Sequence, residues 1–278
     1  MPTKTKPKRR ILSHVVLGVY VLTVLYPLWF VLVASMKNNT ELFNDPWGLP
    51  HQLDFTNYIH VLSNSPIWKN FMNSAIVGLV ATFSTILLST AIAYAVTRMK
   101  FKVLNKLVYG LLLISLLIPP ASLLIPLYIM IKDFGLYNSH LALILPYTSF
   151  GIPLSVFIIS AFLKSIPLEL EEAGVMDGLS TYGILGRIII PLTMPTLVTV
   201  FILNFINNWN EYILASLFLS SQELRTMPVA IVAFADKYNF NYGAMTASIV
   251  LSVVPVMIMY AFFQRSIIEG VTAGSVKG

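Results

Sequence analysis

A stripe of carboxamide and carboxylate side chains interrupts a long apolar stretch in the last third of the sequence. Its four members follow the spacing i, i+3, i+4, i+7: Asn204, Asn207, Asn208 and Glu211. They therefore share one helix face, which should turn toward other helices or a water path because polar groups are costly against lipid. Amides both donate and accept hydrogen bonds, which suits a hydroxyl-rich solute. Hydrogen bonding between helices explains the stripe equally well, and Glu211 at the helix end could instead meet a partner protein.

A second polar group is acidic and lies in segment 165–190. It contains four of the chain's 12 acidic residues: Glu169, Glu171, Glu172 and Asp177. Acids early in a helix favour its positive end, and Asp177-Gly178 is a turn signal that should end this short helix. Ser180 can cap a second helix leading toward Pro191. The segment predicts a projecting helix–turn–helix, which is either a docking element or a solvated acidic loop.

Several kinds of catalytic site are missing from the sequence. The four histidines form no His-x-x-x-His pair beside carboxylates, and the chain has no cysteine, so a zinc site is not expected. No Gly-Lys-Ser/Thr phosphate loop and no Gly-x-Ser-x-Gly elbow occurs. We therefore expect no enzyme, no metal and no cofactor in this chain. Energy for active transport would come from an ion gradient or from another subunit.

The composition predicts a membrane protein. Of 278 residues, 56% are hydrophobic and only 11% are charged, with a mean hydropathy of +0.77. A soluble domain carries about 25% charged residues, so this chain has too little charge to coat a water-facing surface. The net charge is +6, and the basic residues lie beside apolar blocks of the sequence. This position favours a membrane surface over nucleic acid as the partner of the basic residues.

Six stretches are long enough to cross a bilayer as helices, which predicts an all-α, multi-pass protein of the cell membrane. They are 11–36, 71–96, 104–131, 141–163, 188–219 and 244–263, of which 188–219 is long and interrupted. The third holds Pro119, Pro120 and Pro126 and should be bent or broken. The first follows a basic start but has no convincing cleavage site, so we expect an uncleaved span.

Charge bias sets the expected orientation. With the N-terminus inside, 13 of the 18 Lys and Arg residues lie on the cytoplasmic side. Six spans then put the C-terminus on the cytoplasmic side as well. An outer loop then holds a short amphipathic helix, whose apolar face should pack on its own bundle: Phe55, Tyr58, Ile59 and Leu62.

The expected division is a basic tail (1–10), a first span (11–36), an extracellular loop (37–70), a core (71–266) with cytoplasmic loop 165–190, and a cytoplasmic tail (267–278).

The acidic segment resembles the cytoplasmic coupling motif of ABC importer permeases. That motif reads Glu-Ala-Ala, three residues, Gly, nine residues, then Ile-x-Leu-Pro. This chain has Glu172-Ala173-Gly174, then Gly178, then Ile188 to Pro191 at the same spacing. Gly174 and Ile190 depart from the motif, and Gly174 should loosen the helix by up to about 1 kcal/mol relative to Ala.

Shorter motifs point to the carbohydrate group of these importers. Ile118-Pro119-Pro120, Trp209-Asn210-Glu211, Gln264-Arg265 and the ending 270–278 are similar to those of its second, maltose-type permease. The resemblance covers nearly the whole chain and implies the transmembrane domain of a type I ABC importer for a sugar or oligosaccharide.

The resemblance also implies partners and roles. They are a second homologous permease, an ABC ATPase dimer that binds ATP and Mg, and an extracellular sugar-binding protein. The residues implied in ATPase coupling are Glu171, Glu172, Ala173, Gly174, Asp177 and Gly178. Those implied in a contact of the C-terminal tail with the ATPase are Ser275, Val276 and Lys277.

Two other transport functions stay open at this stage. One is a permease for glycerol phosphate or another polyol, although a phosphate path would favour Arg or Lys at membrane depth, and none is evident. The other is an ion-driven transporter or channel that works alone, with Glu211 as its intramembrane carboxylate. An intramembrane enzyme would want paired Asp, Ser–Lys or His groups, which are not evident.

Overall fold

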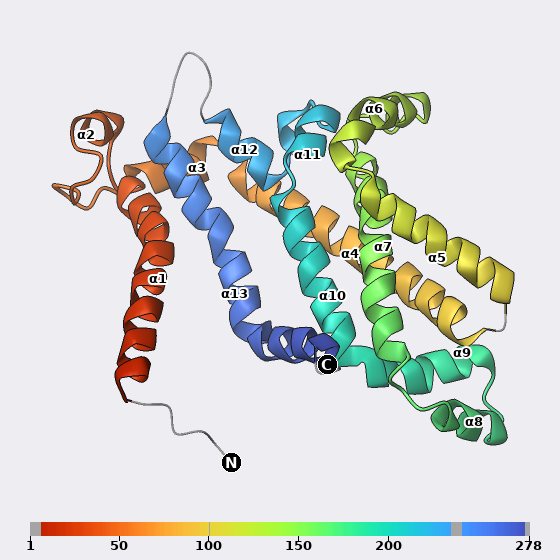
Figure 1. Cartoon of the computed structure of the whole chain (residues 1–278). Coiled ribbons are helices and arrows are strands. Elements are labelled where there is room, and N and C mark those ends of the chain that lie inside the picture. Colours follow the sequence, from red (N-terminus) through yellow and green to blue (C-terminus); the bar gives the residue numbers. More distant parts are fainter. Residues whose placement is uncertain (1–6, 100, 235–240, 276–278) are drawn as a thin grey trace. The chain divides into compact units, whose positions relative to one another are not determined.

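The computed structural model describes residues 7–99, 101–234 and 241–275, and these contain helices and no strand (Figure 1). The all-α class is therefore confirmed. The elements are α1 (Pro7–Ala34), α2 (Asn39–Asn44), α3 (Thr56–Asn64), α4 (Ile67–Arg98), α5 (Lys102–Leu117), η1 (Pro120–Leu123), α6 (Leu124–Asp133), α7 (Leu141–Leu163), α8 (Glu169–Met176), α9 (Thr181–Ile184), η2 (Leu185–Ile189), α10 (Ile190–Asn210), α11 (Ile213–Phe218), η3 (Gln222–Leu224), α12 (Met227–Ala233) and α13 (Tyr242–Ser275).

Five helices of the described chain are long and apolar enough to span a membrane. They are Ser13–Ala34, Ile67–Arg98, Leu141–Leu163, Thr181–Asn210 and Tyr242–Phe262. The pair α5 and η1–α6 makes a sixth if it counts as one span, and it bends by 94°. Ile118, which precedes Pro119, has an extended backbone, as residues before proline prefer. The predicted break in the third stretch is thus present.

The chain divides into two compact units, which are described separately. Unit 1 comprises Met1–Ile67 and Ile231–Val254, and unit 2 comprises Trp68–Ala230 and Pro255–Gly278. Within unit 2, Figure 1 shows α8 and α9 at one end of α7, and α6 and α11 at its other end.

Two buried clusters hold unit 2 together, one toward each end of α7. The first joins α7 to α4, α6 and α11: Val77, Ala81, Ile131, Leu143, Tyr147, Leu214 and Phe218. The second joins α7 to α4, α9, η2 and α10: Ala93, Tyr94, Val156, Ile159, Leu163, Ile184, Ile189 and Val200. Lipid tails are as apolar as these side chains, so close packing rather than escape from water stabilises the contacts within the membrane. The second cluster fixes the segment that follows α7.

Unit 1 contains the predicted amphipathic helix as α3, but the prediction of its packed face is wrong. Ile59 and Leu62 are exposed, whereas Val61 is fully buried. Polar anchors determine this rotation, because the Asn57 amide donates to two backbone carbonyls and the Tyr58 hydroxyl bonds Ser35. The apolar spacing alone carried no information about these anchors.

Candidate functional site

Helix α8 begins and ends as its sequence predicts. Its first turn carries acids, and its last residue is Met176. Gly178 has φ = +81°, a left-handed conformation that glycine adopts at little cost. The Gly178 N–H donates to Val175 O at 3.0 Å, and the Leu179 N–H donates to Gly174 O at 2.9 Å. These two bonds form a Schellman turn, which satisfies the last carbonyls of α8.

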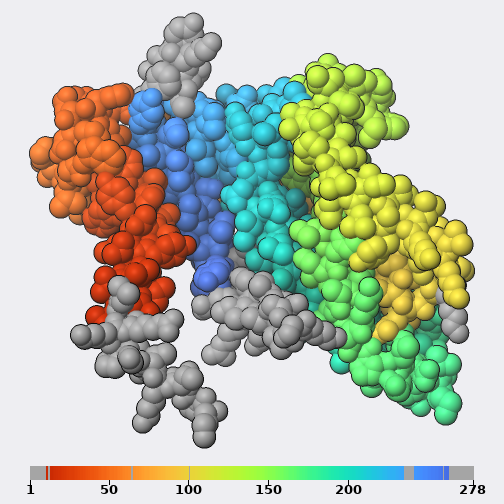
Figure 2. All heavy atoms as spheres, in the orientation of Figure 1, coloured from red at the N-terminus to blue at the C-terminus, as the bar shows by residue number. Residues whose placement is uncertain are grey.

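The next helix starts with the predicted cap. The Ser180 side chain accepts a hydrogen bond from the Gly183 N–H at 3.3 Å. From there α9, η2 and α10 form one continuous helical run from Thr181 to Asn210. Its η2 turn is a π-helix that ends just before Pro191, and the Ile190 N–H bonds Leu185 O. We call residues 165–190, which include α8, α9 and η2, the knob. In Figure 2 its green atoms protrude at one end of unit 2.

Helix α8 has two distinct faces. Glu171 and Gly174 are buried. The other side chains implied in coupling are exposed, namely Glu172, Ala173 and Asp177. Two large apolar side chains beside them are almost fully open, since Met176 is 88% and Tyr182 is 87% exposed. The outward face of the knob is therefore mixed in character, with acids around apolar tips.

Glu171 is held inside the protein by two groups that sequence reasoning missed. Its Oε1 forms an ion pair with the Arg98 Nε at 2.7 Å, and its Oε2 accepts from the Tyr94 hydroxyl at 3.1 Å. Tyr94 lies 77 residues before Glu171 in the chain. No local spacing links the two, although Arg98 at the end of a long apolar helix was a visible signal.

Gly174 lets η2 approach α8 closely. A Cβ built there would lie 2.7 Å from the Cδ1 of Ile188 and 3.5 Å from Ile184. The coupling motif has Ala at this position. In this chain the tip of the Ile188 side chain occupies the space that the Cβ of that Ala would take.

We expect Gly174→Ala to be almost neutral. The Ile188 tip is the end of a flexible side chain and can rotate away, and Ala gains about 1 kcal/mol of helix propensity over Gly. Gly174→Leu should instead separate α8 from η2 and lower the thermal unfolding temperature of the purified protein. Equal losses in both variants would show that the glycine has another role.

The polar stripe of α10 divides into bonded and open members. The Asn204 amide donates to Ser155 Oγ at 3.0 Å, and the Asn208 amide donates to Thr82 Oγ1 at 3.2 Å. A Cβ at Gly151 would lie 2.3 Å from the Asn204 Oδ1, so this glycine allows the close approach. Asn207 is exposed. Bonding between helices thus accounts for Asn204 and Asn208 but not for Asn207.

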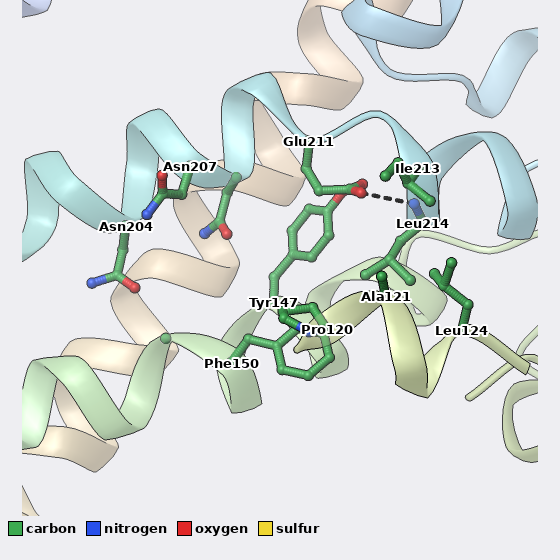
Figure 3. Close-up of a pocket in the computed structure, with 12 residues that line it drawn as sticks. Pro120, Ala121, Leu124, Tyr147, Phe150, Asn204, Asn207, Glu211, Ile213 and Leu214 are labelled. Carbon is green, nitrogen blue, oxygen red and sulfur yellow. Dashed lines mark hydrogen bonds between the residues drawn. The ribbon is translucent and has the colours of Figure 1, made fainter. Parts of the chain in front are cut away.

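All four stripe residues line one cavity of about 220 Å³ within unit 2 (Figure 3). Residues of η1, α6, α7 and α11 complete its wall: Pro120, Ala121, Leu124, Tyr147, Phe150, Gly151, Ile213 and Leu214. Glu211 is its one charged lining residue. The wall is otherwise apolar and aromatic, with amides along one side.

Glu211 ends α10 and begins α11. Its backbone is extended, and its carboxylate accepts from the Leu214 N–H at 2.7 Å, the Ala215 N–H at 3.1 Å and the Tyr147 hydroxyl at 2.6 Å. Figure 3 shows it above the Tyr147 ring. The interruption predicted in the fifth stretch, 188–219, therefore lies at Glu211, between α10 and α11.

The predicted tail contact lies at the edge of the described chain. Ser275 is the last residue of α13. Val276 and Lys277 lie outside the described residues.

Residues 85–271 match the family described as binding-protein-dependent transport system inner membrane component. The chain belongs to this family. The matched region contains both the knob and the cavity, so the two sites lie in the part that defines these permeases.

Full-length relatives support the assignment. The permease is 36% identical over 280 residues to the sulfoquinovosyl glycerol transport system permease SmoH of Agrobacterium fabrum, covering 98% of this chain and 94% of the relative. It is 32% identical over 268 residues to the diacetylchitobiose uptake system permease NgcG of Streptomyces coelicolor, covering 96% and 88%. A crystal structure of a bacterial ABC transporter that imports the acidic polysaccharide alginate contains a chain of the same fold. Its TM-score is 0.83 at 23% identity, covering 95% of this chain and 99% of that one.

Proposed function

We propose that this permease is one of two membrane subunits of an ATP-driven importer for a sugar or oligosaccharide. The observation that carries the proposal is the knob, a short helix with an exposed, mixed face at one end of a membrane-spanning core. An ABC ATPase dimer would bind ATP and Mg, and a binding protein would deliver the solute. A second homologous permease would complete the path. Both termini and the knob would face the cytoplasm.

Coupling would occur through the outward face of α8. Met176 would enter an apolar groove of the ATPase, and Glu172 would meet a basic residue beside it. Exposed apolar tips surrounded by charges are typical of a docking surface. Gly178 would hold α8 at its angle to α9, because the Schellman turn needs a left-handed residue there. Closure of the ATPase pair would then displace the knob. The solute path would change from open toward the cytoplasm to open toward the outside.

The cavity would form a part of the solute path. Its volume of about 220 Å³ is below the roughly 300–1,000 Å³ of a complete small-molecule site, so a second subunit would supply the rest. Amides and aromatic faces suit neutral hydroxyl groups. The lining contains no Lys or Arg, which favours a sugar over glycerol phosphate, since phosphate recognition uses such cations.

Purification of the complex from native membranes, followed by reconstitution in liposomes, tests this function. We expect a second permease and an ATPase at comparable amounts, and ATP-dependent uptake of a labelled carbohydrate from a panel containing trehalose, diacetylchitobiose and arabino-oligosaccharides. Uptake of labelled glycerol 3-phosphate alone would favour the polyol alternative. Uptake by the isolated chain driven by an ion gradient would overturn the importer assignment.

Asn207→Leu should lower the uptake rate of the reconstituted complex without changing its assembly. The Asn207 side chain lines the cavity and makes no hydrogen bond within the described chain. Loss of one hydrogen bond to a neutral solute should reduce uptake by roughly 2- to 10-fold. Asn210→Leu is the matched control, because Asn210 is exposed outside the cavity and bonds only Ile206 O of its own helix. Unchanged kinetics in Asn207→Leu would make the stripe structural only.

A further inference from the structure

We propose that Arg98 is the positioning residue of the knob, because it locks α8 to the ends of α4 and α7. An ATPase that displaces α8 would then move these membrane helices with it. The inference rests on the proposed coupling role of α8. It adds a residue whose side chain is buried and does not line the cavity.

Arg98 joins three segments with one guanidinium group. It is the last residue of α4. Its Nη2 donates to Leu163 O, at the end of α7, and to Ile166 O in the following linker, both at 2.8 Å. Its Nε pairs with Glu171 of α8 at 2.7 Å. The planar fork of arginine can bond these acceptors together, which a lysine ammonium cannot match.

Helix ends strengthen the arrangement. The C-terminus of α7 carries partial negative charge, which attracts the Arg98 cation. Glu171 lies in the first turn of α8, where the partial positive charge stabilises a carboxylate. Tyr94, one turn before Arg98 on α4, donates to the second carboxylate oxygen at 3.1 Å. The Glu171 carboxylate of α8 thus contacts two side chains of α4, Arg98 and Tyr94.

Burial makes the Arg98–Glu171 pair a weak source of stability, which leaves the orientation of α8 as the role that we assign to it. Only 10% of the Arg98 side chain and 11% of the Glu171 side chain are exposed. A buried ion pair seldom stabilises more than well-packed apolar residues would, because both charges lose their water. A buried pair at a hinge point can still restrict α8 to one orientation.

The other connections of α8 are less restrictive. Toward α7 it is joined by a short non-helical linker, toward α9 by the turn at Gly178, and toward η2 by apolar packing of Gly174 on Ile188. Apolar packing has no fixed bonding direction, so without the Arg98 contact α8 could tilt against η2 when the ATPase pulls on it. With the contact, the same pull reaches α4 and α7 directly, while the continuous run from α9 carries it to α10.

The test compares Glu171→Gln with the wild-type complex in liposomes. Glutamine keeps the size and an acceptor for Tyr94 but removes the ion pair. We expect ATP hydrolysis to persist and the amount of carbohydrate taken up per ATP to fall by about 5- to 10-fold. This ratio would not change if the pair only stabilised the fold. Unchanged uptake per ATP in an assembled Glu171→Gln complex would overturn the inference.

A direct distance measurement accompanies the uptake assay. The chain has no cysteine, so Leu170→Cys in α8 and Met99→Cys after α4 are the only spin-labelled sites when the purified chain is labelled before it is assembled with its partners. We expect one narrow distance distribution with and without trapped MgATP in the wild type, and a broad one in Glu171→Gln. Equally narrow distributions in both would contradict a lock.

Two further variants separate the possible failures. Arg98→Met with Glu171→Met leaves no unpaired charge, so it should assemble even if Glu171→Gln does not, and it should show the same uncoupling. Lys69→Met is the matched control, because its ion pair with Glu223 is also 2.7 Å long but is exposed. If the wild-type complex lacks an ATPase, the proposed function fails. If it has one and the double variant couples normally, only the role of Arg98 fails.

Discussion

Replacing Gly178 by proline should lower ATP-driven uptake by roughly 5- to 150-fold while the protein still inserts into the membrane. Proline fixes φ near −65°, whereas Gly178 has φ = +81° and donates its N–H to Val175 O. The Schellman turn would be lost, and α8 would leave its angle to α9. A backbone strain of about 1–3 kcal/mol corresponds to a roughly 5- to 150-fold loss of the docking geometry.

Uptake and ATPase content of the purified Gly178→Pro complex check this result. Gly178→Asn is the matched control, because asparagine tolerates the left-handed conformation and retains the N–H. A Cβ at this position meets no neighbouring atom, so size alone should not matter. Normal uptake with full ATPase content in Gly178→Pro would remove the coupling role from this turn.

The substitution Glu172→Lys should abolish coupled uptake. It would place a cation against the basic residue that we expect on the ATPase.

Glu211→Leu should destabilise the permease strongly. Its carboxylate accepts from the Tyr147 hydroxyl and from two N–H groups at the start of α11. Leucine would leave these donors without their acceptor, at a cost of about 1–3 kcal/mol for each one that stays buried. We expect a clear fall in the thermal unfolding temperature of the detergent-purified protein and poor assembly.

Glu211→Gln provides the comparison, because its one amide oxygen can still accept from the Ala215 N–H and the Tyr147 hydroxyl, although the bond to the Leu214 N–H is lost. It should be more stable than Glu211→Leu and should retain more of the uptake. The opposite pattern is a stable Glu211→Leu protein whose uptake loses its dependence on an ion gradient. That result would identify Glu211 as the carboxylate of an ion-driven transporter.

Local patterns predicted much of the architecture. The apolar stretches, the break at Pro119, the end of α8 and the Ser180 cap all depend on residues within a few positions of one another. The helix face shared by the α10 stripe was also predictable, because helical spacing determines it. The sequence did not predict that Glu172 would face outward and Glu171 inward. Adjacent acids differ only in what packs against each side, and Arg98 is distant in sequence.

Polar contacts explain the other features that the apolar pattern did not predict. The face of α3 that packs is determined by Asn57 and Tyr58, which bond residues near the end of α1. Glu211 ends a helix in the middle of an apolar stretch because its carboxylate caps the next helix. Apolar periodicity reports neither kind of contact, because both are hydrogen bonds made by polar side chains.

Photocrosslinking from Met176 tests the central claim most directly. Because the chain lacks cysteine, Met176→Cys carries the only benzophenone maleimide, on the outward face of α8, when the purified chain is labelled before assembly. Ser220→Cys, exposed after α11 at the other end of α7, is the control. We predict capture of an ABC ATPase from Met176→Cys and not from Ser220→Cys. Active uptake by the labelled complex without ATPase capture at Met176, or equal capture at Ser220, would contradict coupling through α8.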